Sequence, residues 1–329
     1  MKSSIVDMPD GERKMQSKPV ARLGGVTIIL SAIVAGLVIP GLIGVFTTQS
    51  AAGVTVLMAW TLAQTNLATA LLIFVTIAFL LGLWDDIWTA NTKLKLAILL
   101  LAALTSAWFG LRPHSLTSPF GHVQIPVLLT IGSALWLLVF TNAANFMDGS
   151  NGLSIGCLAI MLSGLALIGS SHGAFDLSVG WFALFGAIGG FLVHNLRSNL
   201  YAGDAGALGL GALFASLGLA SGLEVWTVAT LALPFLVDVL LTLVWRAKHG
   251  RSWLSAHRDH AYQRLMDQGW GHLDVAILYW GLSAVCGVGA WIAVQSGGWV
   301  SFTLFWVLLV AGCVLWCVNR STTLLDQSA

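Results

Sequence analysis

Long runs of apolar residues, separated by short polar stretches, make up most of the chain after residue 22. A helix that crosses a bilayer needs roughly 17–25 mainly apolar residues. We therefore predict about ten membrane-spanning helices, over Leu23–Phe46, Leu67–Trp84, Leu94–Leu111, Pro126–Asn142, Leu153–Ser170, Leu177–Asn195, Leu208–Leu223, Val225–Trp245, Val275–Gln295 and Trp299–Val318. The apolar stretch Gly53–Gln64 is too short to cross and is expected to lie along the membrane surface.

The composition agrees with this pattern. Hydrophobic residues make up 57% of the chain and charged residues 9%, whereas a soluble domain carries about 25% charge. We predict an all-α polytopic membrane protein with a single domain, residues 1–329, and no nucleic acid partner. A polar segment, residues 1–22, precedes the first helix and does not resemble a secretory signal peptide. A longer polar loop, residues 247–274, follows the eighth helix.

The basic residues predict the orientation of the helices. With ten crossings, all of the 15 Lys and Arg residues except Arg112 fall on one side of the membrane. The positive-inside rule makes that side cytoplasmic, with both termini inside. The same counting places Asp85, Asp86, Asp148 and Asp204 on the cytoplasmic side. We therefore expect the polar motifs to line a cleft on the cytoplasmic face.

Five acids lie at the edges of the apolar segments or within them: Asp85, Asp86, Asp148, Asp204 and Asp238. Lipid strongly disfavours a carboxylate, so each acid needs a cation, a polar ligand or a wet cleft. The adjacent Asp85 and Asp86 repel each other, which favours a nearby cation or a shared proton. Lys93, at the start of the next helix, returns to the same membrane side. A solvated helix end is the alternative interpretation.

Asn142, Asn145 and Asp148 are spaced three residues apart, which on a helix places them on one face. Asn and Asp oxygens are suitable ligands for Mg²⁺. The alternative is a polar turn whose side chains satisfy backbone groups.

The glycine-rich stretch Gly203–Gly211 opens the seventh helix. A helix N-terminus favours anions, but Asp204 opposes a bare phosphate unless a divalent ion bridges the two. The stretch therefore favours a metal with a diphosphate, with close packing of small residues as the alternative.

The loop after the eighth helix contains His257, Arg258 and His260. Arginine side chains suit phosphate oxygens, and histidines donate hydrogen bonds or carry protons. An ordinary charged cytoplasmic loop has a similar composition. Asp238, inside the eighth helix, either orients this loop or lines a lipid groove.

Taken in order, these motifs resemble the polyprenyl-phosphate N-acetylhexosamine-1-phosphate transferase family, glycosyltransferase family 4. The resemblance covers nearly the whole chain. The matching stretches are Asp7-Met8-Pro9, Arg13-Lys14, Arg22-Leu23-Gly24-Gly25, Gly82 with Asp85-Asp86, Lys93, Asn142 to Gly149, Asn195, Gly203-Asp204-Ala205-Gly206 and His257 to Leu265. The last stretch resembles most the bacterial branch that initiates O-antigen synthesis.

The resemblance implies a reaction in the bacterial inner membrane. Undecaprenyl phosphate attacks a UDP-N-acetylhexosamine, giving undecaprenyl-diphospho-N-acetylhexosamine and UMP. This would be the first membrane step of lipopolysaccharide O-antigen or of another cell-surface polysaccharide. The resemblance also implies Mg²⁺ dependence, with Mn²⁺ as a substitute, and allows a homodimer.

The resemblance implies roles for individual residues. Asp204 and Asn145 would hold the metal, and Asp85 or Asp86 would accept the proton of the lipid phosphate or position it, with Asp148 as a further catalytic acid. Asn151, where many bacterial relatives carry a second aspartate, would face the uracil. The remaining substrate-binding residues would be Lys93, Asn142, Asn195, His257, Arg258 and His260.

A secondary transporter with intramembrane acidic ion sites is the rival interpretation. It predicts carboxylates near the middle of the bilayer on broken helices, often with internal repeats. In this chain most of the acids lie at the ends of the predicted helices and no repeat is evident.

Overall fold

The computed structural model describes residues 6–7, 19–46, 65–88, 90–174, 179–252, 257–297 and 299–326. The motif residues Met8-Pro9 and Arg13-Lys14 and the segment Gly53–Gln64 lie outside the described residues. The helices are α1 (Gly24–Phe46), α3 (Thr65–Trp88), α4 (Thr92–Trp108), α5 (Pro126–Phe146), α6 (Leu153–Ser171), α7 (Val179–Asn195), α8 (Gly203–Ala220), α9 (Val225–Lys248), α10 (Ala261–Asp267), α11 (His272–Ser296) and α12 (Val300–Asp326).

The prediction of an all-α membrane protein is confirmed, because each of the ten predicted segments overlaps a helix. In the part of the chain that the structure describes, seven helices are long and apolar enough to cross a membrane: α3, α5, α6, α8, α9, α11 and α12. Helices α4 and α7 have 17 residues each, at the lower limit for a crossing. The number of ten crossings therefore stays a prediction.

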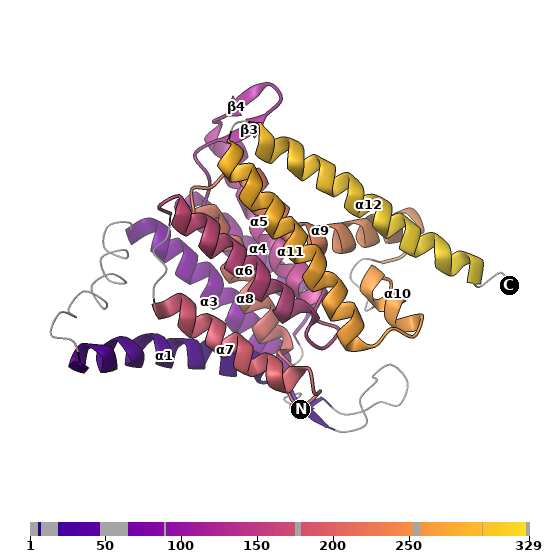
Figure 1. Ribbon diagram of the computed structural model, residues 1–329, viewed down its shortest axis with the longest axis horizontal. Coiled ribbons are helices and arrows are strands. Elements are labelled where there is room, and N and C mark those ends of the chain that lie inside the picture. Colours follow the sequence, from indigo (N-terminus) through magenta and orange to yellow (C-terminus); the bar gives the residue numbers. More distant parts are fainter. Residues whose placement is uncertain are drawn as a thin grey trace.

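Helix α8 lies at the centre of the bundle, where it packs against α1, α3, α5 and α6 (Figure 1). Its glycine and alanine residues let neighbouring backbones come close. A Cβ atom on Gly25 of α1 would lie 2.1 Å from the backbone nitrogen of Gly206. A Cβ on Gly82 of α3 would lie 2.3 Å from the carbonyl oxygen of Asp204. The beginning of α8 is therefore held by direct backbone contact with two other helices.

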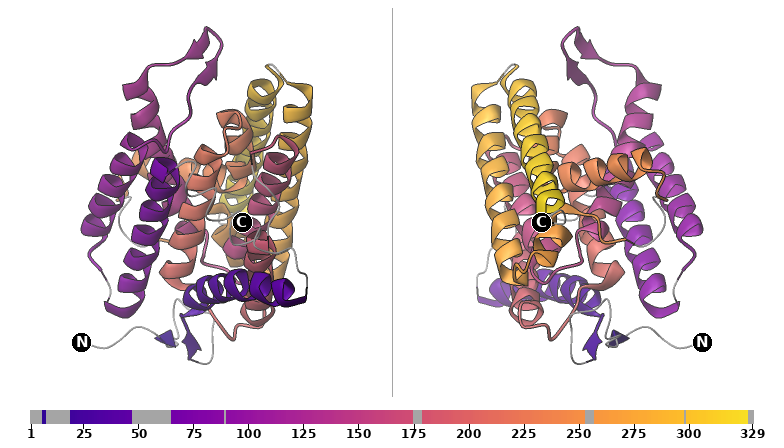
Figure 2. Two further views of the ribbon diagram at one scale, coloured as in Figure 1. Left: turned by 90° about the vertical axis from the view of Figure 1, so that its left-hand side faces the viewer. Right: turned by 90° about the vertical axis from the view of Figure 1, so that its right-hand side faces the viewer.

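Helices α9, α11 and α12 pack on one another. Helices α11 and α12 lie at the edge of the bundle away from α3 and α4 (Figure 2). Helix α12 exposes Val307, Val310 and Val314, as expected for a surface that faces lipid.

The two ends of the bundle differ in structure. One end carries the antiparallel hairpin of β3 (Leu116–Ser118) and β4 (Gly121–Val123), at the top of Figure 1. The other end holds α10, the C-terminal end of α5 and the beginning of α8. Strands β1 (Val6–Asp7) and β2 (Val20–Ala21) also pair, and Ala21 bridges to Leu200 just before α8.

Several local expectations need correction. Helix α3 continues past Asp85-Asp86 to Trp88. Helix α5 ends at Phe146, so Asp148 lies in the following turn rather than on one helical face with Asn142 and Asn145. Neither the β3–β4 hairpin nor the short helix α10 inside the polar loop 247–274 was predicted.

Candidate active site

Polar side chains from four helices meet at the end of the bundle opposite the hairpin. The ammonium group of Lys95 lies 2.6 Å from Asp85 Oδ2 and 2.8 Å from Asp204 Oδ2. The side-chain amide of Asn145 donates to the same oxygen of Asp204 at 3.3 Å. These residues come from α3, α4, α5 and α8, and together with Asp86 and Asp148 we call them the acid cluster. The predicted convergence of Asp85, Asn145 and Asp204 is therefore present in the structure.

The two adjacent aspartates of α3 have different surroundings. Asp86 is buried and accepts hydrogen bonds from the backbone N–H groups of Asp204 and Ala205, at 3.0 and 2.9 Å. It therefore caps the N-terminus of α8, where free N–H groups favour a carboxylate. Asp85 instead contacts Lys95. Asp86 thus fixes the position of Asp204, while Asp85 faces the cation.

Asp148 follows α5 in a tight turn beside the other acids. Burial, and the nearby carboxylates of Asp204 and Asp86, raise the pKa of Asp148 well above its ordinary value. The charged form is disfavoured because three carboxylates share one region of low dielectric. Asp148 therefore belongs to the same polar region as Asp86 and Asp204.

The predicted substrate-binding asparagines lie near the acid cluster but bond elsewhere. Asn142 donates to Leu138 O of its own helix at 2.7 Å. Asn195 accepts from the N–H of Gly152 at 2.6 Å and donates to Leu200 O at 2.8 Å, so it joins two loops. Asn151 donates to Ser198 Oγ at 2.7 Å. The structure thus gives Asn195 a clear role in shaping this end of the bundle.

The histidine segment, His257 to His260, packs on the last residue of α5. The rings of His257 and His260 are 5.0 Å apart and lie 6.5 and 5.8 Å from the Phe146 ring, between centroids. Because Phe146 follows Asn145, both histidines lie on the same side of the molecule as the acid cluster. The predicted grouping of these motifs at one end is therefore observed.

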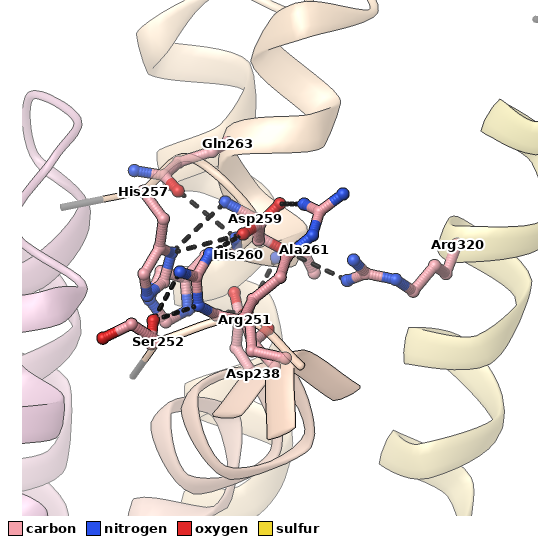
Figure 3. Close-up of polar contacts among 11 residues, drawn as sticks. Asp238, Arg251, Ser252, His257, Asp259, His260, Ala261, Gln263 and Arg320 are labelled. Carbon is pink, nitrogen blue, oxygen red and sulfur yellow. Dashed lines mark hydrogen bonds and ion pairs between the residues drawn. The ribbon is translucent and has the colours of Figure 1, made fainter. Parts of the chain in front are cut away.

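Three arginines hold Asp259, between the two histidines (Figure 3). Its carboxylate pairs with Arg246 and, at 3.3 Å, with Arg251. Its carbonyl oxygen accepts from Arg320 Nη1 of α12 at 3.1 Å. The guanidinium of Arg320 also stacks on the Trp245 ring, 3.5 Å from its centroid. The segment is thereby attached to both α9 and α12.

Arg258 bonds Asp267 Oδ1 of α10 at 2.9 Å, at a partly exposed position. One contact of this arginine is therefore with α10.

Comparison with known proteins places the chain in a family. Residues 68–222 match the model of glycosyl transferase family 4. A phospho-N-acetylmuramoyl-pentapeptide-transferase from Synechococcus sp. (strain JA-2-3B'a(2-13)) is 34% identical over 250 residues, which cover 68% of this chain and 71% of that protein. A probable undecaprenyl-phosphate N-acetylglucosaminyl 1-phosphate transferase from Bacillus subtilis (strain 168) is 25% identical, over 94% of this chain and 83% of the relative. The chain belongs to the polyprenyl-phosphate hexosamine-1-phosphate transferase family.

In this transferase the lysine that contacts the acids is Lys95 and not Lys93. Asn91 caps α4 by accepting from the N–H groups of Lys93 and Leu94. Two residues of helix correspond to about 200° of rotation, so the two lysines point in nearly opposite directions. Lys93 is exposed, whereas Lys95 lies between Asp85 and Asp204. The sequence could not separate the two lysines because the rotation of α4 about its axis was unknown.

The lowered pKa of His257 predicts how the stability of the transferase depends on pH. Burial, with further contributions from His260 and Arg246, lowers the pKa of His257 to about 4. Between about pH 6.5 and pH 4 the unfolded chain binds a proton at this position that the folded protein does not bind. His257 therefore makes the folded state progressively less stable as the pH falls through this window.

We expect the His257→Gln variant to lose less thermal stability than the wild type between pH 7 and pH 5, measured by the melting temperature in detergent. An equal loss in both proteins would show that His257 is not the responsible group.

Proposed function

We propose that this protein transfers N-acetylhexosamine-1-phosphate from a UDP-sugar to undecaprenyl phosphate and releases UMP. The observation that carries the proposal is the meeting of Asp85, Asn145 and Asp204 at one end of the bundle: the Lys95 ammonium group lies between the two carboxylates, and Asn145 bonds Asp204. Phosphoryl transfer depends mainly on positioning and on neutralising charge, and these are the properties that such a cluster supplies. The names of the relatives support a polyprenyl phosphate acceptor.

The donor atoms of the acid cluster fit a magnesium ion, with Mn²⁺ as a substitute. Mg²⁺ is usually bound by one or two carboxylates and completes its shell with water and substrate phosphates. Asp204 and Asn145 would hold it, with the amide of Asn145 turned so that its oxygen faces the metal. Among the described residues, no three acidic, histidine or cysteine side chains form a ready-made metal cage. When bound, the ion would polarise the diphosphate and offset its charge.

The remaining polar residues have proposed roles around the phosphates. Asp85 accepts the proton of the lipid phosphate, and Asp86 keeps α8 in place. Asp148 is a further proton carrier. Lys93, Lys95 and Arg258 are the positive groups proposed to offset phosphate charge. His257 and His260 would reach the same end and donate hydrogen bonds to phosphate oxygens.

Asn151, Asn142 and Asn195 shape the region proposed for the nucleotide. Asn151 faces the uracil in this proposal, as the family resemblance implies, and it lies in the turn that follows Asp148. Asn195 holds that turn through its bond to Gly152.

The proposed setting is the cytoplasmic face of a bacterial inner membrane, at the first membrane step of O-antigen or another surface polysaccharide. The predicted orientation supports this face, because α5 ends and α8 begins on the side that carries most of the basic residues. A homodimer is compatible with the proposal.

Release of UMP tests this function. Purified protein in lipid-containing detergent should release UMP from at least one member of a panel of UDP-N-acetylhexosamines only when undecaprenyl phosphate and Mg²⁺ are both present. Parallel reactions omit the lipid or the metal, or replace the donor by UDP-N-acetylmuramoyl-pentapeptide. UMP release that does not depend on the lipid would contradict the proposal, and release only from the pentapeptide donor would contradict the proposed sugar.

A further inference from the structure

A buried carboxylate in the middle of α9 is not part of the acid cluster. Asp238 is 2% exposed and lies in a helix long and apolar enough to cross the membrane. A charged group in such a place is costly unless donors satisfy its oxygens. The identity of those donors therefore indicates what the carboxylate holds in position.

Three close donors come from α10 and α11 (Figure 3 shows the α10 side). Asp238 Oδ1 accepts from the backbone N–H of Ala261 at 2.7 Å, and Oδ2 accepts from that of Tyr262 at 3.2 Å. The hydroxyl of Tyr279 donates to Oδ2 at 2.7 Å. Asp238 therefore receives the first N–H groups of α10, which the helix itself cannot satisfy.

The same contact fixes the histidine that begins α10. His260 is the N-cap residue of this helix, is 2% exposed, and places its Nδ1 3.4 Å from Asp238 Oδ1. Movement of the first turn of α10 would therefore move His260 with it.

Tyr262 continues the connection toward the acid cluster. It is 1% exposed, and its hydroxyl donates to the carbonyl oxygen of Phe146 at 3.0 Å. A Cβ atom on Gly149 would lie 2.1 Å from that hydroxyl oxygen, so only glycine fits there. One residue of α10 thus contacts both the end of α5 and the turn that carries Asp148.

From this geometry we propose that Asp238 is a positioning residue, which holds α10 so that His257 and His260 stay packed on Phe146, the residue next to Asn145 of the acid cluster. The proposal rests on the proposed function and names a residue that touches no reacting group. It assigns Asp238 neither to an ion pathway nor to a lipid groove, because its oxygens accept from the protein itself. Misplacing a phosphate-binding segment by about 1 Å can reduce turnover about a hundredfold.

The Asp238→Asn variant tests the connection at one end. In this variant an NH₂ group replaces one of the two carboxylate oxygens. In either orientation of the amide, that NH₂ group lies against the N–H of Ala261 or of Tyr262, so one hydrogen bond to α10 is replaced by repulsion between two donors. The Tyr262→Phe variant tests the other end, because it removes the hydroxyl that bonds Phe146 and leaves both bonds of Asp238 to α10 in place. We expect kcat to fall about 10- to 100-fold in Asp238→Asn and less in Tyr262→Phe. The KM for the UDP-sugar should stay within about twofold.

Tyr279→Phe is the matched control. It also removes a buried hydrogen bond to Asp238, but that bond leads to α11 and leaves both α10 contacts in place. We expect kcat near that of the wild type, even if its melting temperature falls as far as that of Asp238→Asn. A loss of kcat that follows the melting temperature across all three variants would overturn the positioning role, as would wild-type kcat in both Asp238→Asn and Tyr262→Phe.

A measurement without substrate separates this inference from the proposed function. Trypsin should cut after Arg251 or Arg258 faster in Asp238→Asn than in Tyr279→Phe, since only the first variant loosens α10. If the wild type releases no UMP, the proposed function fails, while the cleavage comparison still tests the connection. Equal cleavage rates in the two variants would refute the connection alone.

Discussion

Replacing Asp204 with asparagine is expected to abolish transfer while the protein still inserts into the membrane. The carboxylate binds Lys95 and would supply the anionic ligand of the metal. Its loss removes the negative charge that balances the Lys95 ammonium group and the metal ion. Removing one group that stabilises charge in a transition state typically costs a hundredfold or more in kcat, roughly 3 kcal/mol or more. The side chain is 29% exposed, and the cap on α8 uses its backbone N–H rather than its carboxylate. The helix should therefore keep its position.

A matched control for this variant lies in the first turn of α11. Asp274→Asn makes the same chemical change at an exposed helix N-terminus, where the carboxylate accepts from the N–H of Gly271 at 3.0 Å. This variant should keep nearly full UMP release, measured at saturating Mg²⁺ and lipid. Full activity in Asp204→Asn would remove Asp204 from the metal site, and equal losses in the two variants would point to a general effect of removing an acid.

Substitution of Lys95 by alanine is expected to have the second largest effect. Lys95 is 17% exposed and bridges two carboxylates, which repel each other once the ammonium group is gone. We expect kcat to fall about a hundredfold, whereas Lys93→Ala should cost less than about tenfold because Lys93 is exposed at the start of α4.

The two lysine variants are compared side by side for kcat and for the KM of the lipid. A larger loss in Lys93→Ala than in Lys95→Ala would favour the role that the sequence motif implied for Lys93. Such a result would also mean that the Lys95 ammonium group no longer lies between Asp85 and Asp204 when substrate is bound.

The convergence of the acid cluster could be predicted from sequence because two independent patterns agreed. The lengths of the apolar runs placed Asp85, Asp148 and Asp204 near helix ends, and the basic residues placed those ends on one side of the membrane. Neither pattern depends on how a helix is rotated about its axis. The family resemblance then connected the motifs to a reaction, and the comparisons confirmed the family.

Features that depend on rotation or on distant partners could not be predicted. The stretch Gly203–Gly211 was expected to open the seventh helix, and α8 begins at Gly203, but its cap, Asp86, lies 118 residues from Asp204 in the sequence. The choice between Lys93 and Lys95 depends on how α4 is rotated about its axis. The sequence leaves two alternatives for Asp238 because two of its donors belong to α10, a helix too short for an apolar pattern to reveal.

The glycine contacts among α1, α3 and α8 have a consequence for how substrates enter. At Gly25, Gly82 and Gly206 the main chains touch without intervening side chains, so no rotamer change can create space on that wall. The lipid and the nucleotide of the proposed reaction would therefore have to enter elsewhere than between α1, α3 and α8. We expect a single methyl group added at position 25 or 82 to displace the beginning of α8, and Asp204 with it, and so to reduce catalysis.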